Sequence, residues 1–278
     1  WVSKVAGRGL GIVTLRDDSH SKFPSLFVAN DVTENFLFRH AESQAQSKTT
    51  LDEIALVQGT AVDSDGRPQA SMGIAADDFN GDGKLDIFVT NFYDDWNTLY
   101  LQQDAGLFVD ATRGSGLGEP SLLMLGFGTQ GVDANLDGNP DLVVANGHLV
   151  NDVHHQVPYR MLPQFYLNRG NAQFDEIPAK SLGNYFTRVR LGRGLALIDF
   201  DRNGREDFAV THLYEPVELV ANRTETQNHY LTLKLRARTS SRDAFGAKVT
   251  VVTENGTRFR ELVAGSGFQA ANERQLIF

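Results

Sequence analysis

The sequence predicts an all-β chain made of repeated units, and three observations support this fold class. Short apolar runs rich in β-branched and aromatic residues recur along the 278 residues, bounded by turn residues. Glycine is abundant, with 26 residues, and sustained helical periodicity is rare. A short pattern of aspartate, asparagine and glycine occurs three times, each time directly before an apolar run. Because a unit of about 40 to 65 residues with about four strands is typical of a propeller blade, we predict a partial β-propeller and a small C-terminal β module.

The repeated pattern reads D-x-[DN]-x-[DN]-G-x-x-D. Its copies span 78–86, 133–141 and 199–207, and the apolar runs that follow span 87–90, 142–145 and 208–211. These runs are short and show no helical period, so we predict that each copy is a loop leading from one strand to the next. A glycine stands five residues before each first aspartate, at Gly73, Gly128 and Gly194.

Side chains with oxygen atoms stand at loop positions 1, 3, 5 and 9 of each copy. Calcium takes six to eight hard oxygen ligands in a flexible shell, and the backbone carbonyl of position 7 can contribute one. Glycine at position 6 allows a sharp turn without a Cβ clash. We therefore predict about three Ca²⁺ sites, with ligands from Asp78, Asn80, Asp82, Lys84 and Asp86, from Asp133, Asn135, Asp137, Asn139 and Asp141, and from Asp199, Asp201, Asn203, Arg205 and Asp207.

The pattern begins like an EF-hand loop but ends differently. Position 12, where an EF-hand carries a bidentate glutamate, is occupied by Val89, Val144 and Val210. A single copy is also compatible with a turn that binds no metal. Three copies in one register favour a metal site over that alternative.

The net charge of −9 argues against nucleic acid as a partner. Each copy holds three aspartates, and without metal these carboxylates repel one another, so we expect metal binding to be coupled to local folding. Affinities on the order of 10⁻⁴ to 10⁻³ M, as in extracellular modules, fill such sites only where calcium is plentiful. We therefore expect a secreted, cell-surface or periplasmic location, although the chain begins at Trp1 and shows no signal peptide.

Hairpins are predicted between the loops, from 97–102 to 107–110 and from 165–168 to 173–175, each across a turn that contains glycine. A decayed copy of the unit stands near the start of the chain, where 25–30 matches the strand after the loop. Its ligand positions are Asp17, Ser19, Ser21, Phe23 and Ser25, Lys22 replaces the glycine, and counting from Gly11 indicates a one-residue insertion. We expect this first blade to fold without binding calcium well.

The chain is predicted to divide into propeller blades over 1–220 and a small β module over 228–278, with the boundary inside 218–227. The module shows alternation over 230–235, and a hairpin of 247–253 with 258–263 turns at Asn255-Gly256. We interpret it as a capping or packing module rather than a separate binding site. A weak helix is predicted over 51–57.

The loops, their glycine lead-in and the following strands resemble FG-GAP, or VCBS-type, repeats, the calcium-bearing blades of integrin α subunits. Gly126-Phe127-Gly128 retains the Phe-Gly element. The C-terminal part resembles the ASPIC/UnbV domain in 228–235, 241–249 and 265–268. This pairing is typical of bacterial relatives of cartilage acidic protein. The resemblance implies a calcium-binding propeller and attaches no known chemistry to the C-terminal domain. It also implies that the module is truncated at Phe278. The blades are expected to form an open arc or part of a longer propeller.

Two classes of function remain. The first is a non-enzymatic binding or adhesion module for a protein or polysaccharide outside the cell, and the alternative is a polysaccharide-acting enzyme or its accessory domain. The absence of cysteine excludes disulfides and a cysteine nucleophile, and the sequence has no G-x-S-x-G nucleophile elbow. No apolar run is long enough to span a membrane as a helix. No catalytic residues are predicted, so binding is favoured over catalysis.

Three further groups carry two interpretations each. Asp94, Asp95 and Trp96 fit a sugar-binding face or, more simply, a solvated loop. A group of histidines consists of His148, His154 and His155. It is compatible with a transition-metal site or with a loop that binds no metal. An enzyme would need a group of basic side chains near a calcium ion. The compact basic group of the sequence consists of Arg188, Arg190 and Arg193, in a stretch that also holds Tyr185. We interpret this group as the solvated face of a strand.

Overall fold

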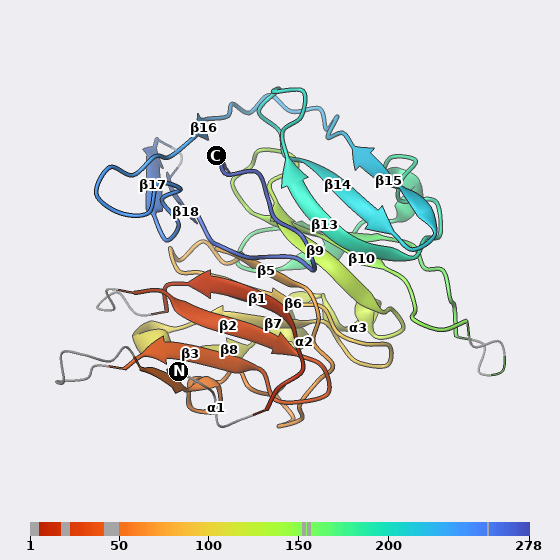
Figure 1. The fold of residues 1–278 in the computed structure, drawn as a ribbon. Coiled ribbons are helices and arrows are strands. Elements are labelled where there is room, and N and C mark those ends of the chain that lie inside the picture. Colours follow the sequence, from red (N-terminus) through yellow and green to blue (C-terminus); the bar gives the residue numbers. More distant parts are fainter. Residues whose placement is uncertain (1–5, 18–22, 42–49, 152–153, 155–156, 255) are drawn as a thin grey trace.

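The computed structural model describes residues 6–17, 23–41, 50–151, 154, 157–254 and 256–278 (Figure 1). It consists of four small antiparallel sheets arranged as a four-bladed β-propeller, with two two-stranded sheets after them. The predicted all-β propeller is therefore confirmed. Within the described residues, no helix is both long enough and apolar enough to cross a membrane.

Each blade is a meander in which consecutive strands pair. Blade 1 holds β1 (Gly9–Leu15), β2 (Ser25–Asn30), β3 (Phe36–His40) and β4 (Leu51–Glu53). Blade 2 holds β5 (Ile74–Asp77), β6 (Asp86–Val89), β7 (Thr98–Gln102) and β8 (Phe108–Asp110). Blade 3 holds β9 (Gly126–Val132), β10 (Asp141–Asn146), β11 (Gln164–Asn168) and β12 (Phe174–Glu176). Blade 4 holds β13 (Gly192–Ile198), β14 (Asp207–His212) and β15 (Glu215–Val220).

The C-terminal residues form a pair of β16 (Thr232–Leu233) with β19 (Leu276–Ile277) and a hairpin of β17 (Lys248–Thr253) with β18 (Gly256–Glu261). The helices are single turns: α1 (Ala55–Gln58), α2 (Thr112–Ser115), α3 (Gly118–Ser121), η1 (Asp104–Gly106) and η2 (Ala179–Ser181). The helix predicted over 51–57 was wrong for its first half. Those residues form β4 because Leu51 pairs with His40, and sheet pairing overrides a weak helical preference.

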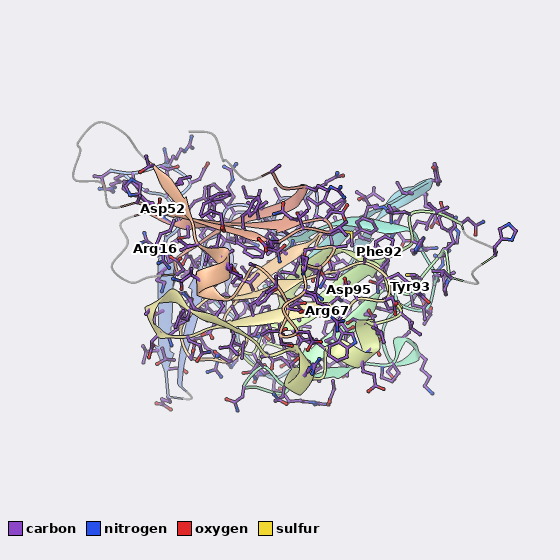
Figure 2. All side chains as sticks on the ribbon, turned by 90° about the horizontal axis from the view of Figure 1, so that it is seen from below. Arg16, Asp52, Arg67, Phe92, Tyr93 and Asp95 are labelled. Carbon is purple, nitrogen blue, oxygen red and sulfur yellow. The ribbon has the colours of Figure 1, made fainter. Side chains whose placement is uncertain are left out.

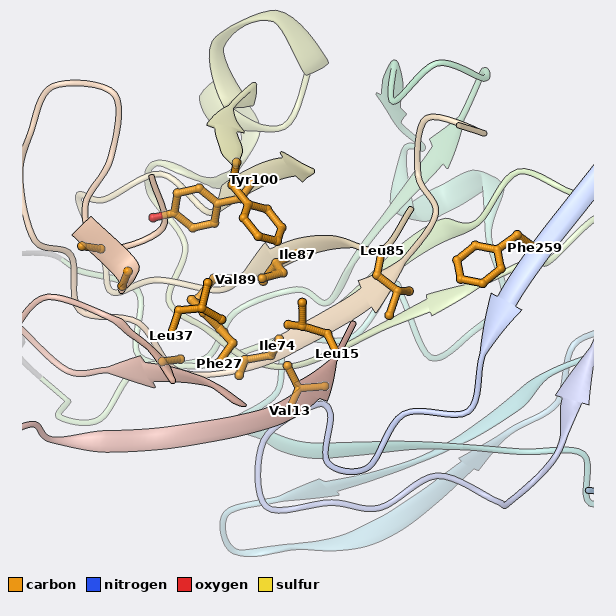
Figure 3. Close-up of a cluster of buried hydrophobic side chains, with 14 residues drawn as sticks. Val13, Leu15, Phe27, Leu37, Ile74, Leu85, Ile87, Val89, Tyr100 and Phe259 are labelled. Atoms are coloured by element: carbon orange, nitrogen blue, oxygen red, sulfur yellow. The ribbon is translucent and has the colours of Figure 1, made fainter. Parts of the chain in front are cut away.

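The core lies between neighbouring blades, because alternate side chains of one strand point to opposite faces of its sheet. In β6, Ile87 and Val89 pack into a cluster shared with blade 1, which Figure 3 shows. Phe88, between them, packs into a second cluster shared with blade 3. A third cluster joins blades 3 and 4. The short strands therefore read as continuous apolar runs because both of their faces are covered.

The centre of the propeller is filled by residues 264–273, which we call the axial segment. It forms hydrogen bonds with the first strand of every blade (Figure 1). The Thr14 amide donates to the Ala264 carbonyl at 2.8 Å, and Ile74 exchanges backbone hydrogen bonds with Gly267. The buried Gln130 accepts from the Ser266 hydroxyl at 2.8 Å, and Leu197 donates to Asn272 at 2.9 Å. The C-terminal residues are thus part of the propeller core.

The lead-in glycines mark close contacts between consecutive blades. A Cβ added to Gly73 would lie 1.9 Å from the Phe127 carbonyl oxygen of the next blade, and one added to Gly128 would lie 2.5 Å from that of Arg193. In the described part of the chain blade 4 is followed by the C-terminal residues, and a Cβ on Gly194 would lie 3.1 Å from the Phe268 carbonyl oxygen. The axial segment therefore occupies the place that the first strand of a following blade would take.

Candidate metal centre

The three predicted loops share one backbone conformation. Each connects the first strand of a blade to the second, as predicted. Positions 4 and 6 have positive φ in every copy, at Gly81 and Gly83, Leu136 and Gly138, and Arg202 and Gly204. The glycine at position 6 thus stands where the left-handed conformation requires it, with φ between 78° and 83° in the three loops.

Aspartate at position 1 organises each loop from inside. The two carboxylate oxygens of Asp133 accept the Asp137 and Gly138 amides at 3.0 and 2.8 Å, and Asp78 and Asp199 accept the amides at the same loop positions. The side chain at position 3 accepts the amide of position 5, and position 5 accepts that of position 7. These side-chain oxygens therefore converge on the inside of the turn.

Aspartate at position 9 joins the loop to the third strand of its blade or the segment after it. Asp86 accepts the Phe79 and Gln102 amides, and Asp141 accepts the Ala134 and Asn168 amides. Asp207 accepts the Phe200 and Asn222 amides in the same way. All three carboxyl groups belong to residues with no exposed surface. Position 9 is thus a structural link as well as a candidate ligand.

In the third loop the carboxylates of Asp199, Asp201 and Asp207 approach closely enough to hold a metal ion, with ligand oxygens all within 4.8 Å of one another. This loop carries aspartate at position 3 and asparagine at position 5, whereas the first two loops carry the reverse order. Asn80 and Asn135 therefore present amide oxygens where the third loop presents the Asp201 carboxylate. The donor set of all three loops consists of hard oxygens, which fits calcium.

Burial raises the pKa of five of the nine aspartate carboxyl groups in the loops. It raises the pKa of Asp78 and Asp133 to about 6 and that of Asp86 and Asp141 to about 8, with neighbouring loop carboxylates adding to the rise. Burial also raises the pKa of Asp207. The pKa of Asp201 is instead lowered by a hydrogen bond from Arg223, which lies 2.6 Å away. Crowded buried carboxyls favour either a proton or a cation.

Blade 1 departs from the pattern as its sequence predicted. Leu15 pairs with Ser25, which leaves one residue more in the loop than in blade 2, where Asp77 pairs with Asp86. The buried Asp17 accepts hydrogen bonds from Arg39 at 2.6 and 2.9 Å and from the Ser25 hydroxyl at 2.8 Å. The guanidinium thus supplies the positive charge in this blade. Of the other decayed positions, Phe23 is half-exposed, and Ser19, Ser21 and Lys22 lie outside the described residues.

The histidines are not brought together in the described part of the chain. His148 is buried, its ring packs edge-on against Phe92 and Tyr93, which Figure 2 labels, and its Nδ1 lies 2.9 Å from the Val150 carbonyl oxygen. His154 is exposed, and His155 lies outside the described residues. Within the described residues, no metal-binding group of side chains includes His148 or His154.

The interpretation of the arginine group as a solvated strand face was wrong. Arg190 is buried, with ion pairs to Glu215 at 3.2 Å and Glu218 at 2.6 Å. Arg193 is also buried, and its guanidinium lies 4.0 Å from the centroid of the Phe127 ring. Arg188 remains exposed. Sequence periodicity missed this because the partners come from β15 and from the neighbouring blade.

Asp95 and Arg67, labelled in Figure 2, line a cavity of about 240 Å³ together with Asp94 and Trp96. Burial raises the pKa of Asp95. The Trp96 ring packs against Gly118, and the Arg113 guanidinium lies 5.5 Å from its centroid. A sugar-binding role for Asp94, Asp95 and Trp96 stays a prediction.

Comparison with known proteins finds two matching parts. A family model described as FG-GAP-like repeat matches residues 78–144 and 133–210, so each match begins on the first aspartate of a loop and ends in the strand after the next loop. A family model described as ASPIC and UnbV matches residues 237–278. The repeats matched are those whose loop geometry is intact.

Similar proteins match nearly the whole chain in sequence. Cartilage acidic protein 1 of Mus musculus is 26% identical over 275 residues, which cover 96% of this chain and 39% of that protein. The Homo sapiens protein of the same name is also 26% identical, with 96% and 38% covered. The chain thus spans about two fifths of the length of these relatives.

A solved structure of an Agrocybe aegerita lectin, described as recognising non-reducing terminal N-acetylglucosamine, aligns with 77% of this chain and 67% of its own. The identity is 13% and the TM-score 0.30, which is too low to carry an argument. The family matches and the propeller fold support the same assignment independently of this lectin structure. The chain therefore carries FG-GAP-like repeats followed by an ASPIC and UnbV domain, and it is similar to cartilage acidic protein 1.

Proposed function

We propose that the chain is a calcium-dependent, non-enzymatic binding or adhesion module that works outside the cytoplasm on a protein or polysaccharide. The observation that carries the proposal is the convergence of Asp199, Asp201 and Asp207, in a loop whose backbone conformation recurs twice in the chain. Calcium is the ion that a set of carboxylate, amide and carbonyl oxygens fits best. Bound there, it would neutralise each loop without taking part in chemistry.

Residues at positions 1, 3, 5, 7 and 9 of each loop would hold the ion, as the sequence predicted. Position 9 contacts both its own loop and a later segment of the blade, so an ion at that carboxylate would fix two connections at once. Rigid loops at one end of a propeller provide a surface for a macromolecular ligand. The burial and pairing of Arg190 and Arg193 support binding over catalysis, because this basic group is not free to act on a substrate. We retain 1–220 as the proposed binding unit.

Calcium titration of metal-stripped protein by calorimetry is the test. We expect about three sites, with dissociation constants on the order of 10⁻⁴ to 10⁻³ M. A ligand that binds the folded state stabilises it by about 2.7 kcal/mol per site at 100 times its dissociation constant, so melting temperature should rise strongly in calcium. Magnesium serves as the control, because it demands a smaller octahedral shell.

Absence of calcium binding, or binding without any rise in melting temperature, would contradict the proposal. Binding to immobilised polysaccharides and extracellular-matrix proteins, measured in calcium and in chelator, then tests the second half of it. Binding that is lost in chelator supports the module function. Chemical turnover of a polysaccharide would favour the enzymatic alternative.

The pH dependence of stability provides an independent check. The folded pKa of Asp78 and Asp133 is about 6, and that of Asp86 and Asp141 is about 8. All lie above the unfolded value of about 3.9, so the protonated groups favour the folded state. This contribution is present at low pH and is lost as pH rises through about 6 to 8.

Metal-free protein should therefore melt at a lower temperature at pH 8.5 than at pH 5.5, and saturating calcium should reduce the difference. Melting curves across this range in chelator and in calcium measure both effects. A metal-free melting temperature that is flat or rises with pH would show that the loop carboxyls do not take up protons on folding.

A further inference from the structure

The C-terminal module, residues 228–278, is seated on two of the three loops at their position-6 glycines. A Cβ added to Gly138 would lie 2.0 Å from Arg258 Nε, and one added to Gly204 would lie 2.2 Å from the Tyr230 ring. Both glycines have positive φ. The turn that shapes each loop thus also forms the surface against which the module packs.

The second loop offers its backbone carbonyls to the C-terminal residues. Arg258 Nη2 donates to the Asp137 carbonyl at 3.3 Å, and Asn228 Nδ2 donates to the Asn135 carbonyl at 3.3 Å. Just before the module, Asn222 Nδ2 donates to the Ala134 carbonyl at 3.0 Å. All three acceptors are backbone carbonyls of this loop, so the three contacts together depend on the turn that the loop adopts.

The third loop is held in a similar way. The Glu273 carboxylate accepts the Asp199 amide at 3.2 Å and pairs with Lys234 at 2.9 Å. Asp199 is the first proposed ligand of that loop. Module residues on both sides of β17 and β18 therefore contact the third loop.

The turn of the first loop lacks such cover, and the module meets this loop instead at Leu85, which shares a buried cluster with Phe259 of β18. A Cβ added to Gly81 or to Gly83 would meet no atom within 4 Å. The three loops have the same conformation and different neighbours, so the first loop is an internal control for any effect of the module on the other two.

Charge also ties the module to the loops. The Arg260 side chain is 11% exposed and pairs with Glu206 at 2.9 Å, and Glu206 in turn accepts the Asp133 amide at 3.1 Å. A cavity of about 640 Å³, lined by Asp78, Asp133 and Asp137 on one side and Tyr230 and Arg258 on the other, separates the remaining surfaces. This cavity gives an ion a route to the loops while the module stays in place.

We propose that loading of the second and third loops with calcium and docking of the hairpin β17–β18 and the neighbouring Tyr230 form one coupled equilibrium, in which Arg258 and Tyr230 are positioning residues. The inference rests on the proposed calcium binding. An ion that fixes the loop favours the docked module, and by linkage the docked module raises the affinity of the loop for the ion by the same factor. The module does not touch the turn of the first loop, so the coupling of that loop should be weaker.

Hydrogen exchange of the intact chain, followed by mass spectrometry, tests the proposal. Amides of β17 and β18 should exchange at least about tenfold more slowly in saturating calcium than in chelator. Asp141→Asn, which removes a proposed ligand of the second loop, should reduce this calcium response. The matched change Asp86→Asn in the first loop, whose turn the module does not touch, should reduce it less.

The reverse direction is measured by calorimetry. Arg258→Ala should weaken one of the three calcium sites about tenfold, the size expected for a lost hydrogen bond and its packing. Arg258→Lys, which keeps a donor, should restore part of the affinity, and Tyr230→Ala should weaken a different site. Arg238→Ala, at an exposed arginine of the module, is the control and should change none.

The two proposals fail in different ways. Wild-type protein that binds three calcium ions, with unchanged exchange in β17 and β18 and unchanged affinities in Arg258→Ala and Tyr230→Ala, would overturn the coupling and leave the calcium function standing. Wild-type protein that binds no calcium would overturn both. Equal responses to Asp86→Asn and Asp141→Asn would also overturn the coupling, because contact between the module and the turn would then make no difference.

Discussion

Replacing Phe268 by alanine is expected to lower the free energy of unfolding by about 3 to 5 kcal/mol, the range for truncating a buried phenylalanine. Phe268 is 6% exposed, and its ring packs against Phe127 with centroids 5.0 Å apart. Met72, Leu125 and Met161 complete its buried surroundings. Because these residues come from blades 2 and 3, the truncation would open a cavity inside the propeller rather than at the edge of a separate domain.

Urea denaturation monitored by circular dichroism measures this effect. Phe245→Ala is the matched control, because Phe245 belongs to the same module but is 41% exposed. It should change stability much less, since surface substitutions usually stay within about 0.5 kcal/mol. A loss below about 1 kcal/mol for Phe268→Ala would show that the axial segment does not fill the propeller centre in solution.

The role of the axial segment could not be predicted from the sequence. The sequence identifies residues 265–268 as part of a domain signature. Their local pattern does not indicate which residues they contact. Ser266 meets Gln130, which is distant in the chain, because the topology brings them together. Long-range hydrogen bonds of this kind leave no periodic signal in either segment.

The loops and their strands could be predicted, because they depend on local spacing. The nine-residue pattern, the positive-φ glycine and the strand that follows are fixed by residues within one loop, and the structure places all three as expected. The decayed first blade was also predicted from Asp17 and Ser25. The role of Arg39 there was missed, because this cation arrives from β3, outside the loop.

The buried arginines show the same limit. Arg188 and Arg190 stand two residues apart, which favoured a strand face, yet β13 begins only at Gly192 and the burial of each arginine depends on what covers it. Glu215 and Glu218 neutralise Arg190 from β15, and such a pair is stable in a protein interior only when its geometry is good. The spacing of these arginines therefore gave neither the strand boundary nor which of the side chains meets solvent.

Substitutions of Asp141 are expected to separate its structural role from its proposed calcium role. Asp141 has no exposed surface, and its carboxyl accepts the Asn168 and Ala134 amides at 2.8 and 3.2 Å. Asp141→Ala would leave two buried amides without acceptors, at about 1 to 3 kcal/mol each. We therefore expect a loss of about 2 to 6 kcal/mol in chelator, and a larger loss in calcium, where a ligand of the ion is removed as well.

Asp141→Asn should behave differently in the two conditions. Burial raises the pKa of Asp141 to about 8, so in metal-free protein at pH 7 the carboxyl is mostly neutral and the loss of its charge costs little. Asparagine keeps an acceptor for one of the two amides and leaves the other unpaired, so the loss should be about half that of Asp141→Ala. In calcium the same change removes a charged ligand, so calorimetry should detect one site fewer, and the gain in melting temperature should shrink. If Asp141→Asn kept every site, Asp141 would not be a ligand. If Asp141→Ala lowered the free energy of unfolding in chelator no more than Asp141→Asn does, the hydrogen bonds to Asn168 and Ala134 would not stabilise the fold. The contribution of Asp141 to stability would then come from the bound ion alone.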